Sequence, residues 1–130
     1  MYTTDSWYWD QSPESRAWTE RYRAVMNKVP VSLHASTYSA VMTYLDAVKA
    51  TGTDDGDKVM AQLKKAKISD MYTTNATIRE DGRMMGDLKL IQVKDPSESK
   101  YPWDYYKIAQ IIPAAEAYTT KAESQCALWK

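Results

Sequence analysis

The sequence has few of the residues on which metal and disulfide chemistry depends. Its one cysteine, Cys126, excludes an internal disulfide and a cysteine-rich zinc site. Its one histidine, His34, excludes a multi-histidine metal centre. The four glycines include no G-x-G pair, so no loop of the kind that cradles phosphate groups is present. We therefore expect no metal site and no cofactor.

Charge of one sign and long apolar runs are also missing. Lys and Arg number 17, as do Asp and Glu, so the chain lacks the basic surplus that nucleic-acid binding usually needs. No stretch approaches the roughly 18 apolar residues of a membrane span. Residues 1–5 carry no signal-peptide pattern, which predicts a cytosolic protein, a processed one or a piece of something longer. With 130 residues, 44% of them hydrophobic, residues 1–130 are expected to form a single globular domain.

Residues 1–66 are expected to be mainly helical. Ser12 and Pro13 form a helix start, and the apolar spacing that follows predicts a helix to residue 27. Residues 32–51 repeat apolar side chains at close to 3.6 residues, and Gly52 suits the helix end. Residues 57–66 predict a third, shorter helix.

Residues 67–130 are expected to be strand-rich. Residues 68–77 suggest irregular structure, and Asp81-Gly82 predicts a hairpin turn. Residues 85–94 suit a strand covered on both faces, and residues 105–112 a second strand that ends at Pro113. The predicted fold class is α/β, with three N-terminal helices and a strand-rich C-terminal half containing a hairpin.

Aromatic residues are unusual in kind, with ten Tyr, five Trp and no Phe. They gather in two clusters, one at residues 101–106 and the other formed by Trp7, Tyr8 and Trp9 with Asp10 beside them. Flat side chains with polar tips suit the walls of a pocket for a small organic ligand. The alternative is that both clusters only pack strands against helices.

Catalysis has little support in the sequence. His34 lies at a predicted helix start without a nucleophile pattern nearby, and Asp54, Asp55 and Asp57 suit helix capping better than calcium binding. Because no nucleophile–base pair is evident, we expect the protein not to be an enzyme.

Three stretches carry a resemblance to a known family: IREDGRM at residues 78–84, VKDPSESK at 93–100 and PWDYYK at 102–107. They resemble the C-terminal segment of solute-binding proteins of ABC transporters, of the branched-chain amino-acid type. The resemblance implies a two-lobed periplasmic receptor without catalytic residues or an obligatory cofactor. Such a receptor binds a small amino acid or small aromatic acid and delivers it to a membrane permease.

The resemblance also implies a ligand-binding location. In the family, the stretch that corresponds to residues 7–10 lies near a crossover between the lobes, so Trp7, Tyr8, Trp9 and Asp10 are the candidate ligand-binding residues. A complete receptor is well over twice this length. The alternative is therefore a truncated or engineered assembly domain that binds no solute and self-associates as a homodimer through residues 88–93 and 105–112.

Overall fold

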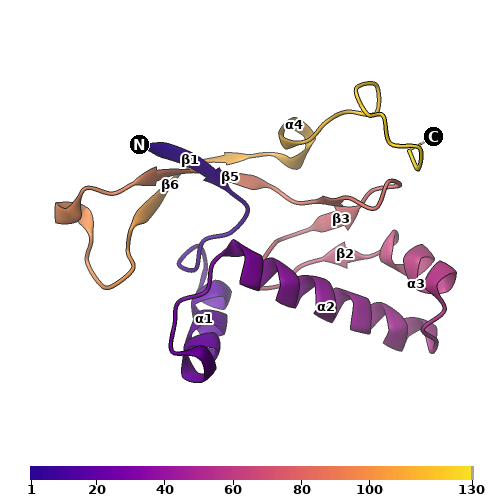
Figure 1. The fold of residues 1–130 in the computed structure, drawn as a ribbon, viewed down its shortest axis with the longest axis horizontal. Coiled ribbons are helices and arrows are strands. Elements are labelled where there is room, and N and C mark those ends of the chain that lie inside the picture. The colour runs from indigo at the N-terminus through magenta and orange to yellow at the C-terminus, as the bar shows by residue number, and fades with distance from the viewer. Residues whose placement is uncertain (130) are drawn as a thin grey trace.

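The computed structural model describes residues 1–129, and three helices form its N-terminal half (Figure 1). They are α1 (Pro13–Met26), α2 (Ser32–Thr51) and α3 (Gly56–Leu63). The Ser12 hydroxyl accepts a hydrogen bond of 3.1 Å from the Ser15 amide, as a helix cap should. Gly52 ends α2 with φ at 66°, in the left-handed conformation that glycine adopts freely. The three predicted helices are confirmed, although α3 begins one residue earlier and ends three residues earlier than predicted.

The strands form two small antiparallel sheets. The first has the order β1 (Tyr2–Asp5), β5 (Leu88–Val93) and β6 (Tyr106–Ile112). The second has the order β2 (Lys67–Ile68), β3 (Ala76–Ile78) and β4 (Met84–Met85). A 3₁₀ helix, η1 (Pro96–Glu98), and a short helix, α4 (Ala114–Ala117), complete the fold. The mixed helix and strand class is confirmed.

The hairpin is confirmed, but its surroundings differ from the prediction. Ile78 pairs with Met84, and Gly82 adopts φ of 85° in the turn. Residues 69–75 form neither helix nor strand, as predicted for residues 68–77, whereas the two ends of that stretch belong to β2 and β3, whose short pairing the sequence pattern does not indicate. The strand predicted within residues 85–94 is confirmed as β5, but it is not covered on both faces, because Ile91 is its one buried residue.

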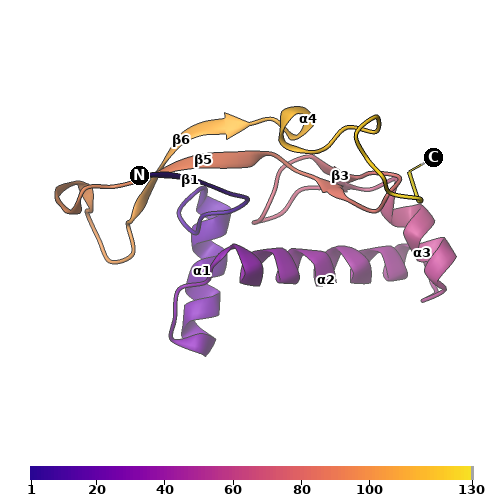
Figure 2. The same ribbon diagram turned by 45° about the horizontal axis from the view of Figure 1, so that its top comes forward.

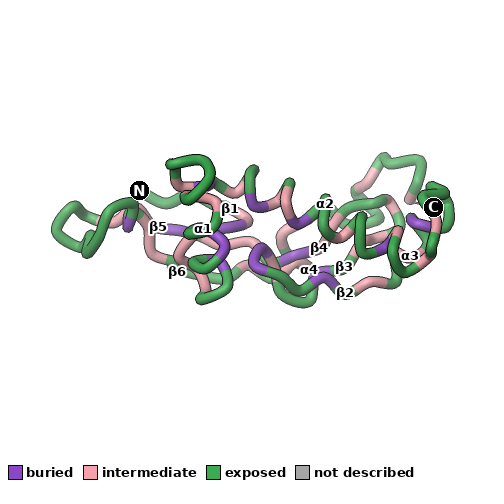
Figure 3. Tube along the Cα trace, turned by 90° about the horizontal axis from the view of Figure 1, so that it is seen from below, coloured by how far each residue is buried: buried purple, intermediate pink, exposed green. Residues whose placement is uncertain are grey.

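The helices lie on one side of the sheets. In Figure 2, α1 stands beneath the β1–β5–β6 sheet, and α2 runs along beneath the smaller one. The main core forms where these layers meet and contains Trp7, Trp18, Ala35, Met71 and Tyr72. Buried positions are scattered along the elongated chain rather than concentrated in one deep centre (Figure 3).

Helix α2 buries a face other than the one that its large apolar residues suggest. Leu33, Val41 and Leu45 are 74%, 51% and 50% exposed. The fully buried positions are small residues at Ala35, Ser39 and Ala47. Hydrophobic periodicity therefore predicts the helix correctly but not its buried face. The side of α2 that packs closely against the β2–β3 connection carries small residues.

Candidate ligand-binding site

The aromatic segment at residues 7–9 lines a cavity of about 420 Å³. Residues 27–32, which comprise the connection between α1 and α2 and the first residue of α2, supply a second wall. The third wall consists of Trp103 and Tyr105 from the connection between β5 and β6, and of Tyr106 at the start of β6. The structure therefore brings together both aromatic clusters that stand out in the sequence.

Trp7 and Tyr8 are both buried but have different surroundings. The Trp7 indole nitrogen donates a hydrogen bond of 2.9 Å to the Met71 carbonyl oxygen, and its ring packs edge-on against Trp18. The Tyr8 hydroxyl donates a hydrogen bond of 3.1 Å to the Trp103 carbonyl oxygen. Burial raises the pKa of Tyr8, so this hydroxyl stays protonated and acts as a donor.

Trp9 is half-buried and converges on the same acceptor as Tyr8. Its indole nitrogen donates a hydrogen bond of 3.1 Å to the Trp103 carbonyl oxygen. Its ring meets Tyr101 edge-to-face, with 6.1 Å between the ring centres. Trp9 thus presents a fixed aromatic surface with its polar tip already bonded.

Asp10 lies at the edge of this cluster and has its partners within the chain. Its carboxylate accepts hydrogen bonds from the Arg16 guanidinium and from the Tyr101 hydroxyl. The hydrogen bond to Asp10 raises the pKa of Tyr101 to about 12. The Asp10 carboxylate therefore holds the Tyr101 side chain beside the Trp9 ring.

The sequence did not single out residues 27–32. Asn27 ends α1 in the left-handed conformation, and Pro30 prevents the helix from continuing. The chain can then turn tightly and reach the aromatic cluster. This Asn and Pro spacing between two helices is the signal that could have indicated a cavity wall.

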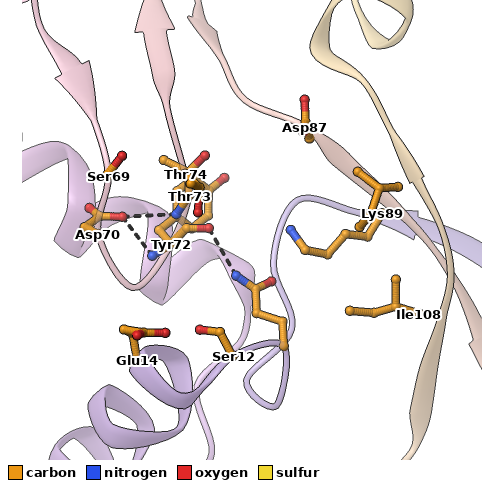
Figure 4. A pocket seen from close by; sticks show the side chains of 12 residues that line it. Ser12, Glu14, Ser69, Asp70, Tyr72, Thr73, Thr74, Asp87, Lys89 and Ile108 are labelled. Carbon is orange, nitrogen blue, oxygen red and sulfur yellow. Dashed lines mark hydrogen bonds between the residues drawn. The ribbon is translucent and has the colours of Figure 1, made fainter.

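A second, more polar cavity of about 570 Å³ lies between the start of α1 and the β2–β3 connection (Figure 4). The Gln11 side-chain amide donates a hydrogen bond of 3.2 Å to the Tyr72 carbonyl oxygen across it. Lys89 borders the cavity from β5, and its ammonium group donates to the Ser6 carbonyl oxygen at 2.9 Å. Burial lowers the pKa of Lys89. Several polar groups of this cavity are thus bound within the chain, and Tyr72 is the one aromatic residue in its described lining, compared with six in the first cavity.

Other candidate groups serve structural purposes. The His34 ring nitrogen Nδ1 accepts a hydrogen bond of 3.1 Å from the Val31 amide and so caps α2. Within residues 1–129, no group of three or more His, Cys, Asp or Glu side chains is arranged to hold a metal ion. None of the helices in that part of the chain is both long and apolar enough to cross a membrane.

A family model described as periplasmic binding protein matches residues 1–100. A search of curated proteins found no match.

Solved structures match the whole chain closely. A periplasmic binding protein from Burkholderia mallei is 57% identical, with a TM-score of 0.96 over all of this chain. A branched-chain amino acid ABC transporter periplasmic ligand-binding protein from Burkholderia xenovorans is 38% identical, with a TM-score of 0.94 over 99% of this chain. The match covers 34% of each of those proteins, so the chain spans about a third of their length.

A more distant structure shares the fold alone. A leucine-binding protein from Thermotoga maritima is 21% identical, with a TM-score of 0.66 over 87% of this chain and 31% of its own.

Proposed function

The chain belongs to the periplasmic binding protein family, and from that premise we propose that it is part of the substrate-binding component of an ABC transporter. The solute is a small amino acid or a small aromatic acid. The proposal includes a periplasmic location, delivery of the solute to a membrane permease and no catalytic step. The family membership of the chain rests on the match to residues 1–100 and on the two Burkholderia structures.

The cavity with aromatic walls is the observation that allows the proposed ligand binding to be assigned to specific residues. Its volume of about 420 Å³ lies within the range of small-molecule sites. Tyr8 and Trp9 lie on one wall, and Trp103 lies on another. We assign ligand contact to the segment from Trp7 to Asp10, with Trp9 presenting its ring and Asp10 holding Tyr101 beside it.

The wall chemistry agrees with a solute that has an apolar body and a carboxylate. Indole and phenol faces accept an aliphatic or aromatic side chain through apolar contact. Lys28 lies in the lining and offers an ammonium group to a carboxylate. Amino acids and small aromatic acids both combine these two features.

A thermal-shift screen with L-leucine, other amino acids and benzoate tests the proposal. A ligand at 100 times its dissociation constant should stabilise the protein by about 2.7 kcal/mol. Trp9→Ala should remove the shift, whereas Tyr44→Ala, at an exposed position on α2 outside the lining, should keep it. An equal shift in both variants would contradict the assignment to this cavity.

A second candidate function is self-association without solute binding. The exposed face of α2 favours it, because Leu33, Val41 and Leu45 follow one another at spacings of eight and four residues on one side of the helix. A second copy of the chain could cover this apolar surface. Sedimentation over a hundredfold concentration range would show rising mass, which Leu45→Lys should suppress. A constant monomer mass would exclude this candidate.

A further inference from the structure

Trp103 has a backbone conformation that tryptophan rarely adopts. Its φ is +66°, in the left-handed region. Within residues 1–129, the other non-glycine residues with positive φ are Asn27 and Asn75. Asparagine tolerates this region because its short polar side chain can hydrogen-bond locally, whereas a bulky residue there is an outlier. Such strain persists only where the surroundings impose it, and it clusters at ligand sites and switches.

The following residue, Asp104, is buried and bonded to several neighbours. It is 1% exposed, and its carboxylate forms an ion pair with Lys94. The same carboxylate accepts a hydrogen bond of 3.0 Å from the Lys100 amide. The Asp104 carbonyl oxygen accepts another, of 2.7 Å, from the Ser99 hydroxyl. Asp104 is thus fixed through its side chain and its backbone, which leaves Trp103 little freedom to relax.

The conformation directs one carbonyl oxygen at three donors. The Trp103 oxygen accepts from the Tyr8 hydroxyl at 3.1 Å, from the Trp9 indole nitrogen at 3.1 Å and from the Tyr105 amide at 2.9 Å. Two of these donors are the aromatic side chains of the cavity wall. Trp9 and Trp103 also line a smaller cavity of about 370 Å³ against α1, so the orientation of Trp9 shapes both spaces.

We propose that Trp103 is a positioning residue, whose left-handed backbone aims a single carbonyl oxygen at both Tyr8 and Trp9 and thereby sets the orientation of the ligand wall. This inference rests on the proposed function, because it assigns a role at the same cavity. In this proposal the backbone conformation of Trp103 orients Tyr8 and Trp9, and the Trp103 ring contributes less.

Two substitutions of Trp103 distinguish the contribution of its backbone conformation from that of its ring. Trp103→Gly and Trp103→Val both remove the indole, but glycine adopts positive φ freely and a β-branched residue resists it. The readout is the indole N–H resonance of Trp9 in ¹⁵N NMR spectra recorded without ligand. The Trp7 indole N–H, bonded to the Met71 carbonyl oxygen 2.9 Å away, is the control within the same molecule.

We expect the Trp9 resonance of the glycine variant to keep a hydrogen-bonded shift and that of the valine variant to move toward the solvent-exposed value. The Trp7 resonance should stay in place in both. If the Trp9 resonance is the same in the two variants, the backbone does not position Trp9 and the proposal is wrong. If the valine variant loses the Trp7 resonance as well, it has unfolded, and Asp104→Asn then provides the test by removing the ion pair with Lys94. In that variant, an unmoved Trp9 resonance overturns the proposal.

A titration with L-leucine and with benzoate connects the geometry to binding. Where the unmodified protein binds one of them, the valine variant should bind it about five- to tenfold more weakly than the glycine variant, as expected for the loss of an ordering hydrogen bond. Equal affinities of the two variants would contradict the positioning role. If the unmodified protein binds neither probe, the proposed function has failed on these probes, whereas the NMR comparison still decides whether Trp103 orients Trp9.

Discussion

The hydroxyl of Ser39 donates a hydrogen bond of 2.5 Å to the carboxylate of Asp70. Ser39 is buried on α2, and Asp70 lies in the connection between β2 and β3. The other carboxylate oxygen of Asp70 accepts from the Tyr72 amide at 2.8 Å and from the Thr73 amide at 3.1 Å. This single carboxylate therefore ties the long helix to the loop that carries core residues.

Ser39→Ala should lower the free energy of unfolding by about 1.5–3 kcal/mol, because a buried hydrogen bond to a charged group is lost. Urea denaturation measures the change. Ser36→Ala is the matched control on the same helix, since Ser36 is half-buried and its hydroxyl donates to the Leu33 carbonyl oxygen of its own helix. We expect it to stay within about 0.5 kcal/mol of the unmodified protein. Equal losses in the two variants would mean that the contact with Asp70 contributes little.

Trp7 and Trp9 should differ in what they contribute to stability. Trp7→Ala should lower the free energy of unfolding by about 3–5 kcal/mol, because it leaves a cavity in the core where the Trp7 side chain is only 2% exposed. Trp9→Ala should cost less and leave the melt cooperative, since Trp9 is half-buried at the edge of the cavity. Chemical denaturation of both variants checks the order. A loss for Trp9→Ala as large as that for Trp7→Ala would make Trp9 a core residue rather than a cavity wall.

The local elements could be predicted from the sequence because their signals are local. The cap at Ser12, the left-handed Gly52 and the Asp81-Gly82 turn each depend on a few neighbouring residues. The aromatic clusters were also visible as candidates. Their meeting at one carbonyl oxygen was not, because it joins residues more than 90 positions apart.

The buried face of α2 shows why the rest could not be predicted. Periodicity places Leu33 and Leu45 on an apolar stripe, and such a stripe usually faces a core. In the structure the helix instead turns Ser39 toward Asp70, a pairing that depends on a loop distant in sequence. The sequence pattern around Ser39 does not indicate which carboxylate its hydroxyl will bond.

Acid should weaken the hairpin through Asp81. Hydrogen bonds from the Arg79 guanidinium lower the pKa of Asp81 from 3.8 to about 2. Because the folded pKa lies below the unfolded one, the stabilisation is present above pH 4 and is lost as the pH falls toward 2. Melting temperatures measured between pH 5 and pH 2 should fall less steeply for Asp81→Asn than for the unmodified protein. Asp54→Asn, at an exposed position, is the control, and a matching change there would assign the effect to general charge.

Alkali should release Tyr101 from Asp10. The hydrogen bond to the carboxylate raises the pKa of Tyr101 from 10.0 to about 12, so the stabilisation is present below pH 10 and is lost as the pH rises toward 12. Absorbance at 295 nm follows tyrosine ionisation, and the difference between the unmodified protein and Tyr101→Phe isolates this side chain. Asp10→Asn removes the negative charge, so the Tyr101 component should shift back toward pH 10. A difference curve that already centres on pH 10 in the unmodified protein would show that Asp10 does not hold Tyr101 in solution, and the support for Trp9 through Tyr101 would then fail with it.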